Sequence, residues 1–145
     1  MSDSRLRSLS LLMALSWMGL LFYLSHQPSL PTPSLFSGQD KIVHALAYGG
    51  LAVMLLGSCS LRAGHYSWRQ IGASVVIASL YGASDELHQS FVPGRSPEIG
   101  DWLADTLGAL IAVLLVASLW PIASELARDA GWLTGDFAHK VAPSA

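Results

Sequence analysis

Four long apolar runs, separated by short polar stretches, dominate the pattern along the chain. They cover Leu9 to Ser25, about Ile42 to Leu61, Ile71 to about Gln89, and about Trp102 to Ile122. About 20 helical residues cross the roughly 30 Å of hydrocarbon in a bilayer, so each run predicts a transmembrane helix. The pattern therefore predicts an all-α polytopic membrane protein, in which residues 1–145 form one domain built on a bundle of four transmembrane helices.

Composition supports this prediction. Of the 145 residues, 52% are apolar and only 12% are charged, whereas about 25% of the residues in a soluble domain are charged. The net charge of -2 provides no basic surface for nucleic acid, so the lipid bilayer is the expected partner and nucleic acid is excluded. Cys59 is the single cysteine and cannot form an intrachain disulfide, so helix packing must hold the fold.

Basic residues indicate the orientation of the helices. Arg5 and Arg7 precede the first run, and Arg62 and Arg69 flank the loop between the second and third runs. By the positive-inside rule that side is cytoplasmic, which places both termini inside. The first run resembles a signal peptide, but no A-x-A-like cleavage site follows it, so we expect an uncleaved span. Residues 123–145 predict a cytoplasmic or interfacial tail.

Polar residues gather where alternating crossings bring segments together. The ends of the first and third runs and the starts of the second and fourth must lie at one membrane face. The ionisable and polar side chains there are Asp40, Lys41, His44, Tyr48, Asp85, Glu86, His88, Gln89, Arg95, Asp101 and Asp105. Intramembrane ionisable residues normally face the bundle and pair. We therefore expect a shallow polar patch at the outer face, with Lys41 and Arg95 as counter-charges.

Helical spacing places several of these side chains on shared faces, because residues four apart lie on one side of a helix. Asp40, His44 and Tyr48 form one stripe, and Asp85, His88 and Gln89 lie on another. Glu86 is rotated by about 100° from Asp85. A third stripe joins the two aspartates of the fourth run to Gly108 and Ala112, whose small side chains favour close helix packing.

The loop after the third run predicts a turn. Pro93 and Gly94 suit the two central positions of a type II turn, because proline fixes φ near -65° and glycine accepts a positive φ. This turn would present Arg95 over the patch. A guanidinium binds phosphate or carboxylate in a bidentate manner, so Arg95 is a candidate to hold a lipid phosphate, an anionic substrate, or Asp101.

Two segments, "DKIVHALAY" and "DELHQSFVPGR", resemble the VanZ-like family of small bacterial membrane proteins. The resemblance extends from about Asp40 to Leu115. Its matching positions are Asp40, Lys41, His44, Tyr48, Asp85, Glu86, Gln89, Phe91, Pro93, Gly94, Arg95, Asp101 and Gly108. The family usually has asparagine where this chain has Asp105, and a second carboxylate near Asp101 can share a proton with it.

The resemblance implies an integral, multi-pass protein of the bacterial inner (cytoplasmic) membrane and envelope, whose namesake is associated with resistance to the glycopeptide teicoplanin. With the polar patch, it favours a site that binds or acts on an amphipathic envelope molecule, such as a lipid-linked or anionic cell-wall precursor. Asp85, His44 and Glu86 are the candidates for acid or base catalysis. The candidates for binding are Asp40, Lys41, Tyr48, His88, Gln89, Arg95, Asp101 and Asp105.

Other functions stay open. The polar residues of a non-catalytic structural or accessory module would only fix helix packing, and a proton-linked transporter would use the carboxylates as a relay. A metal held by His44, His88, Asp85 or Asp40 is not supported by an H-x-x-E-H-like spacing, so we expect neither metal nor cofactor. A second copy of the chain stays open as a partner.

Overall fold

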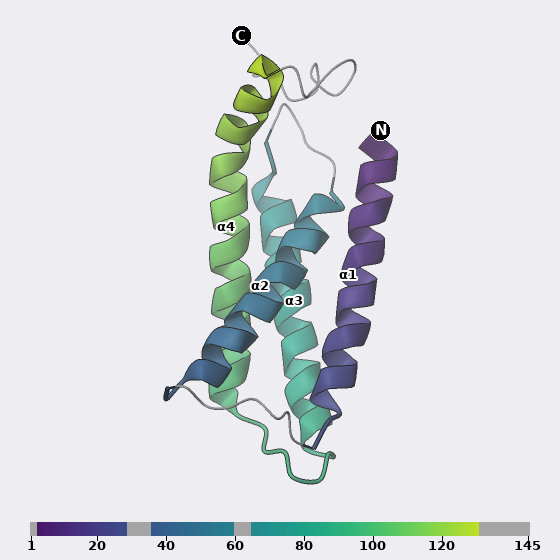
Figure 1. Ribbon diagram of the computed structural model, residues 1–145, viewed down its shortest axis with the longest axis vertical. Coiled ribbons are helices and arrows are strands. Elements are labelled where there is room, and N and C mark those ends of the chain that lie inside the picture. The colour runs from purple at the N-terminus through teal and green to yellow at the C-terminus, as the bar shows by residue number, and fades with distance from the viewer. Residues whose placement is uncertain (1–2, 29–35, 60–64, 131–145) are drawn as a thin grey trace.

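The computed structural model describes residues 3–28, 36–59 and 65–130, which form four α-helices (Figure 1). They are α1 (Asp3–Ser25), α2 (Gln39–Gly57), α3 (Trp68–Gln89) and α4 (Ile99–Asp129). The described residues contain no β-strand, which confirms the all-α prediction. Helix α4 continues past the predicted end at Ile122 to Asp129. Residues 131–145 of the predicted tail, and Arg62, lie outside the described residues.

Local chemistry explains where two of the helices begin. Ser67 and Gln70 form a capping box at the start of α3, in which each side chain pairs with the backbone of the other residue. Gly38 precedes α2 with φ at 85°, a conformation that glycine adopts without steric cost.

The turn between α3 and α4 confirms the type II prediction. Gly94 has φ at 85°, and the Arg95 amide donates to the Val92 carbonyl at 3.1 Å. This hydrogen bond closes the turn around Pro93 and Gly94, and it fixes the point from which the Arg95 side chain leaves the backbone.

Three of the helices are long and apolar enough to cross a membrane: Ser4–Ser25, Gln39–Gly57 and Ile99–Asp129. Helix α3 has 22 residues, which span about 33 Å, but it also carries the polar cluster of the third run. Its solvent-accessible large side chains are nevertheless apolar at Val76, Ile77, Leu80 and Leu87. Composition therefore supports three of the four predicted spans directly.

Successive helices run in opposite directions, so one end of the bundle holds the ends of α1 and α3 and the starts of α2 and α4 (Figure 1). We call this the polar end. At the other end, Arg7 Nε donates to the carbonyl of Ser58, which ties the start of α1 to the region just after α2. The convergence expected from alternating crossings is thus present.

Polarity in the bundle is distributed inside out compared with a soluble protein. Large apolar side chains such as Leu12, Leu46 and Leu107 are more than half exposed on the outer surface. The buried charged residues are Asp85, Glu86, Asp101 and Asp105, and Asp105 is completely inaccessible. A bilayer solvates the apolar exterior, whereas the carboxylates must find partners within the protein.

Helices α2 and α4 form the closest contact in the bundle. A Cβ added to Gly108 would overlap the backbone of Ala45, and one added to Gly49 would lie 3.2 Å from Cβ of Ala112. Small residues four apart on both helices allow this approach, as the stripe of Gly108 and Ala112 predicted. The crossing brings the first turns of α2 and α4 together at the polar end (Figure 1).

Substitution of Gly108 tests the importance of this contact. Gly108→Ala should lower the free energy of unfolding by about 1–3 kcal/mol, because the added methyl group must push α2 away from α4. Gly50→Ala is the matched control, since its Cβ would meet no atom within 4 Å and alanine favours helix. Thermal unfolding in detergent, followed by circular dichroism, measures both. Equal melting of the two variants would contradict close packing at Gly108.

Candidate functional site

Lys41 forms the centre of an ionic cluster where α2 meets α4. Its Nζ lies 3.0 Å from Asp40, 3.0 Å from Glu98 and 2.9 Å from Asp101. The Asp101 side chain is only 11% exposed, whereas the Asp40 and Glu98 side chains are more than half exposed. The pair with Asp101 therefore neutralises a buried carboxylate, and the other two are surface pairs that contribute little to stability.

His44 and Asp105 join α2 to α4 one turn further into the bundle. Nδ1 of His44 lies 3.0 Å from Oδ1 of Asp105, which has no exposed side-chain surface. Because the Asp105 carboxylate accepts this hydrogen bond, Nδ1 of His44 carries the proton. Nε2 of the same ring lies 4.0 Å from Oδ2 of Asp101. A Cβ on Gly82 would lie 2.7 Å from Oδ2 of Asp105, so this side chain also fills a notch in α3. Asp105 thus contacts both α2 and α3.

The end of α3 holds two carboxylates with different surroundings. Oε2 of Glu86 accepts a hydrogen bond from the Glu98 amide at 2.7 Å, which fastens the start of α4 to α3. The Gln89 amide donates to Asp85 at 3.2 Å and to Glu86 at 3.4 Å. Glu86 therefore already has hydrogen-bond partners within the protein, in keeping with its predicted rotation away from Asp85.

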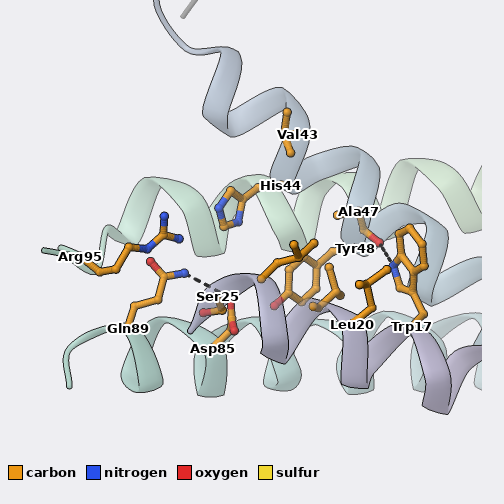
Figure 2. Close-up of a pocket in the computed structure, with 12 residues that line it drawn as sticks. Trp17, Leu20, Ser25, Val43, His44, Ala47, Tyr48, Asp85, Gln89 and Arg95 are labelled. Atoms are coloured by element: carbon orange, nitrogen blue, oxygen red, sulfur yellow. Dashed lines mark hydrogen bonds between the residues drawn. The ribbon is translucent and has the colours of Figure 1, made fainter. Parts of the chain in front are cut away.

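A partly open pocket of about 240 Å³ lies between α1, α2 and α3. Figure 2 shows the residues that line it, with Arg95 at one end. The apolar lining of the pocket consists of Trp17, Leu20, Leu21, Leu24, Val43 and Ala47, of which Trp17, Leu20 and Ala47 lie at the end away from Arg95 in Figure 2. Its part at the polar end is lined by Ser25, His44, Tyr48, Asp85, Gln89 and Arg95. Trp17 also donates its indole N–H to the Ala47 carbonyl at 2.9 Å. The pocket therefore changes from apolar to polar along the axis of the bundle.

Several polar atoms at the polar end of the pocket are buried without a hydrogen bond in the described residues. They are Oγ of Ser25, the hydroxyl of Tyr48 and Nε of Arg95. Ser25 is 4% exposed and Tyr48 is 2% exposed. The Tyr48 hydroxyl points towards Asp85 in Figure 2. A buried polar atom without a partner costs about 1–3 kcal/mol, so these three atoms are available for contacts with groups from outside the chain.

Arg95 forms no ion pair with the described residues, because Asp101 is occupied by Lys41. The alternative in which Arg95 binds Asp101 is therefore contradicted. Figure 2 shows the guanidinium above Gln89 at the mouth of the pocket. The turn at Gly94 thus presents a cation to the pocket, as predicted, and leaves it available for an anion.

The family model for VanZ/LLP1 matches residues 10–120, which is most of the chain. This chain belongs to the VanZ/LLP1 family. Neither the comparison with curated proteins nor the comparison with solved structures gives a match. Membership of this family and three helices that are long and apolar enough to span a bilayer identify the chain as a membrane protein.

His88 occupies a different position in this VanZ/LLP1 protein from the other candidate residues. Its Nε2 lies 3.2 Å from Nδ1 of His26, and its ring packs on Phe22 with 4.5 Å between centroids. It does not line the pocket in Figure 2. The remaining candidates apart from Glu86 divide between the pocket and the ion pairs of α2 with α4, and His44 belongs to both.

Two groups of residues have the spacing of metal ligands. Asp40, Glu98 and Asp101 approach one another within 4.8 Å, but the Lys41 ammonium lies within 3.0 Å of all three and supplies the positive charge there. His44, Glu86 and Asp101 form the second group. Their nitrogen and oxygen atoms are of the types that bind divalent cations. Glu86 and Asp101 already have partners in the chain, and the expectation that this VanZ/LLP1 protein uses no metal stays a prediction.

Three important residues were missed by sequence reasoning. Ser25 and Trp17 come from α1, which contributes a whole wall of the pocket, and Glu98 completes the contacts of Lys41. The position of Ser25, at the end of the first apolar run and therefore at the same membrane face as the patch, is the signal that could have identified it.

Replacement of Asp105 tests the contact with His44. Asp105→Ala should reduce the free energy of unfolding by about 1–3 kcal/mol, because it removes a buried acceptor and leaves His44 unpaired. Asp105→Asn keeps an acceptor oxygen, so its free energy of unfolding should fall by less than that of Asp105→Ala. Asp129→Ala, at the far end of the same helix, is the control. Chemical denaturation in mixed micelles measures the three, and an alanine variant as stable as wild type would show that this hydrogen bond does not hold the helices.

Proposed function

We propose that this VanZ/LLP1 protein is a multi-pass protein of the bacterial cytoplasmic membrane, in which all four helices cross the bilayer. Helix α3 is long enough, runs antiparallel to its neighbours, and exposes apolar side chains such as Val76, Leu80 and Leu87. Its carboxylates Asp85 and Glu86, together with Gln89, are buried inside the bundle rather than on its outer face. Burial of these residues within the bundle offsets their low hydropathy.

The polar end faces the outer leaflet in this proposal. Arg5, Arg7 and Arg69 lie at the opposite end, where α4 also finishes near Arg128. At the polar end, Lys41 is already neutralised by carboxylates, so Arg95 is the one described cation there without such a partner. The positive-inside rule then makes the end with four arginines cytoplasmic and both termini internal.

The proposed activity is binding of an amphipathic envelope molecule in the pocket of Figure 2. The observation that carries this proposal is the pocket itself, which combines an apolar inner part with buried polar atoms that lack partners at Ser25, Tyr48 and Arg95. A headgroup at the polar end and a tail along the inner part would match the orientation of a lipid in the outer leaflet. A lipid-linked cell-wall precursor is one such molecule, and the teicoplanin resistance associated with the family's namesake makes it relevant.

This reading fits the described residues better than the alternatives do. A cluster that only fixed helix register would place its polar atoms mainly against one another, as Lys41 and Asp101 do, whereas three of the five buried polar atoms without a partner in the described residues border the pocket. A proton relay across the membrane needs ionisable groups along its path, but the buried carboxylates here all lie near the polar end. Catalysis by Asp85 or His44 stays a prediction. Both line the pocket, whereas Glu86 does not.

Labelling of introduced cysteines tests the orientation. In a Cys59→Ala background, Ser96→Cys at the polar end should react in intact cells with a maleimide that does not cross membranes, because the loop would face outwards. His65→Cys, which is exposed at the opposite end, should react only after the cells are permeabilised. Reaction of both positions in intact cells, or of His65→Cys alone, would contradict the proposed orientation.

Teicoplanin susceptibility tests the envelope function. A sensitive host that expresses the wild type should be protected, and Arg95→Gln should remove most of the protection because it removes the free cation of the pocket. Arg128→Gln, at the other end of the bundle, is the matched control. Membrane levels of all three proteins must be equal. Protection that survives Arg95→Gln would contradict a role for the pocket. If the wild type gives no protection, this protein does not share the resistance phenotype of the family's namesake.

A further inference from the structure

The pocket contains two opposite charges that the protein leaves without ionic partners. The Arg95 guanidinium forms no hydrogen bond or ion pair in the described residues, and its Nε is buried. Asp85 is 7% exposed; the Gln89 amide donates to it at 3.2 Å, and the Tyr48 hydroxyl points towards it. No lysine, arginine or histidine of the described residues forms an ion pair with Asp85. A buried carboxylate without a cation is costly, so both charges call for groups from outside the chain.

Arg95 and Asp85 both line the polar part of the pocket. Figure 2 shows Arg95, Gln89 and Asp85 in sequence along the polar part of the pocket, with Leu20 and Trp17 further in. Trp17 and Ser25 are eight residues apart on α1, which corresponds to about 12 Å along the helix axis. A ligand that fills the pocket therefore needs an apolar part about this long, joined to a head that carries both a negative and a positive group.

A small headgroup is compatible with the size of the pocket. The pocket has a volume of about 240 Å³ and is partly open to the surface, so a small headgroup and the first carbons of a tail fit this space. The rest of the tail would lie on the exposed apolar surface of α1, where Leu12, Leu15 and Phe22 face outwards.

We propose that the pocket binds the headgroup of a zwitterionic aminoalkyl phospholipid, with its phosphate on Arg95 and its primary ammonium on Asp85. This inference rests on the proposed function and specifies its ligand. Guanidinium binds phosphate oxygens in a bidentate manner. A primary ammonium has three N–H donors, which suit the Asp85 carboxylate and the unpartnered oxygens of Ser25 and Tyr48.

The donor requirement distinguishes this headgroup from similar ones. A quaternary ammonium has no N–H group, so a choline lipid would supply no donor to the oxygens of Ser25 and Tyr48 and would add none to the Gln89 amide at Asp85. A glycerol headgroup provides hydroxyl donors but no positive charge for Asp85. The pocket should therefore prefer ethanolamine to glycerol and choline headgroups, although all three carry the phosphate that Arg95 binds.

Lipid retention after purification tests this preference. Full-length protein is reconstituted into vesicles with equal amounts of phosphatidylethanolamine, phosphatidylglycerol and phosphatidylcholine with identical acyl chains. It is then re-extracted with mild detergent, and the retained lipids are quantified by mass spectrometry. The wild type should retain ethanolamine lipid about tenfold over each of the others. Asp85→Asn, which is nearly isosteric, should abolish this preference, and Arg95→Gln should reduce retention of all three lipids.

Controls separate the possible outcomes. Arg128→Gln should behave as wild type, and thermal unfolding establishes that each variant is folded. Soluble glycerophosphoethanolamine, added during re-extraction, should displace the lipid only at high concentration, because it lacks the tail. Equal retention of the three lipids, or an ethanolamine preference that persists in Asp85→Asn, would overturn the inference while leaving amphipathic binding intact. Retention of no lipid would overturn the proposed function as well.

Discussion

The close approach of α2 and α4 at Ala45 and Gly108 is the constraint on which the rest of the structure depends. Because the two backbones nearly touch there, the side chains on either side of the contact must be small or must interlock. Towards the polar end, His44 meets Asp105 and Lys41 meets Asp101 across the same interface. The ionic network is therefore a product of backbone packing, since a wider crossing would leave these charges too far apart to neutralise one another.

The network in turn determines which charges stay unpaired. Lys41 and His44 lie on the side of α2 that faces α4, and they satisfy the aspartates of that helix. Asp85 and Arg95 lie beyond their reach and border the pocket instead. One set of charges stabilises the bundle and a second set is available to a ligand, although both belong to the same short stretches of sequence. Charges that meet at the contact of α2 with α4 stabilise the bundle, and charges that border the pocket are available to a ligand.

Much of this arrangement could be predicted from the sequence, because it follows from periodicity and local chemistry. Alternating helices bring Asp40 and Asp101 to one end, and Pro93 with Gly94 forces a turn that directs Arg95. The choice of partners could not be predicted. Lys41 and Arg95 are both cations near Asp101 in the sequence pattern, which does not show that Lys41 is the one that binds it. The position of Ser25 at the end of the first run could have placed it at the polar end, but one serine in an apolar run does not show which helix it will face.

The two halves of the pocket have separate origins in the chain. Helix α1 supplies most of the apolar wall, and it is anchored largely through backbone carbonyls: Ser10 and Trp17 donate to those of α2, and Tyr81 of α3 donates to that of Met18. Every residue has a carbonyl, so these anchors tolerate substitution at the accepting positions. Because Ser10 and Trp17 donate from α1 itself, changes at other α1 positions of the wall, such as Leu20 and Leu21, can reshape the pocket while these anchors and the charged residues of α2, α3 and α4 stay intact.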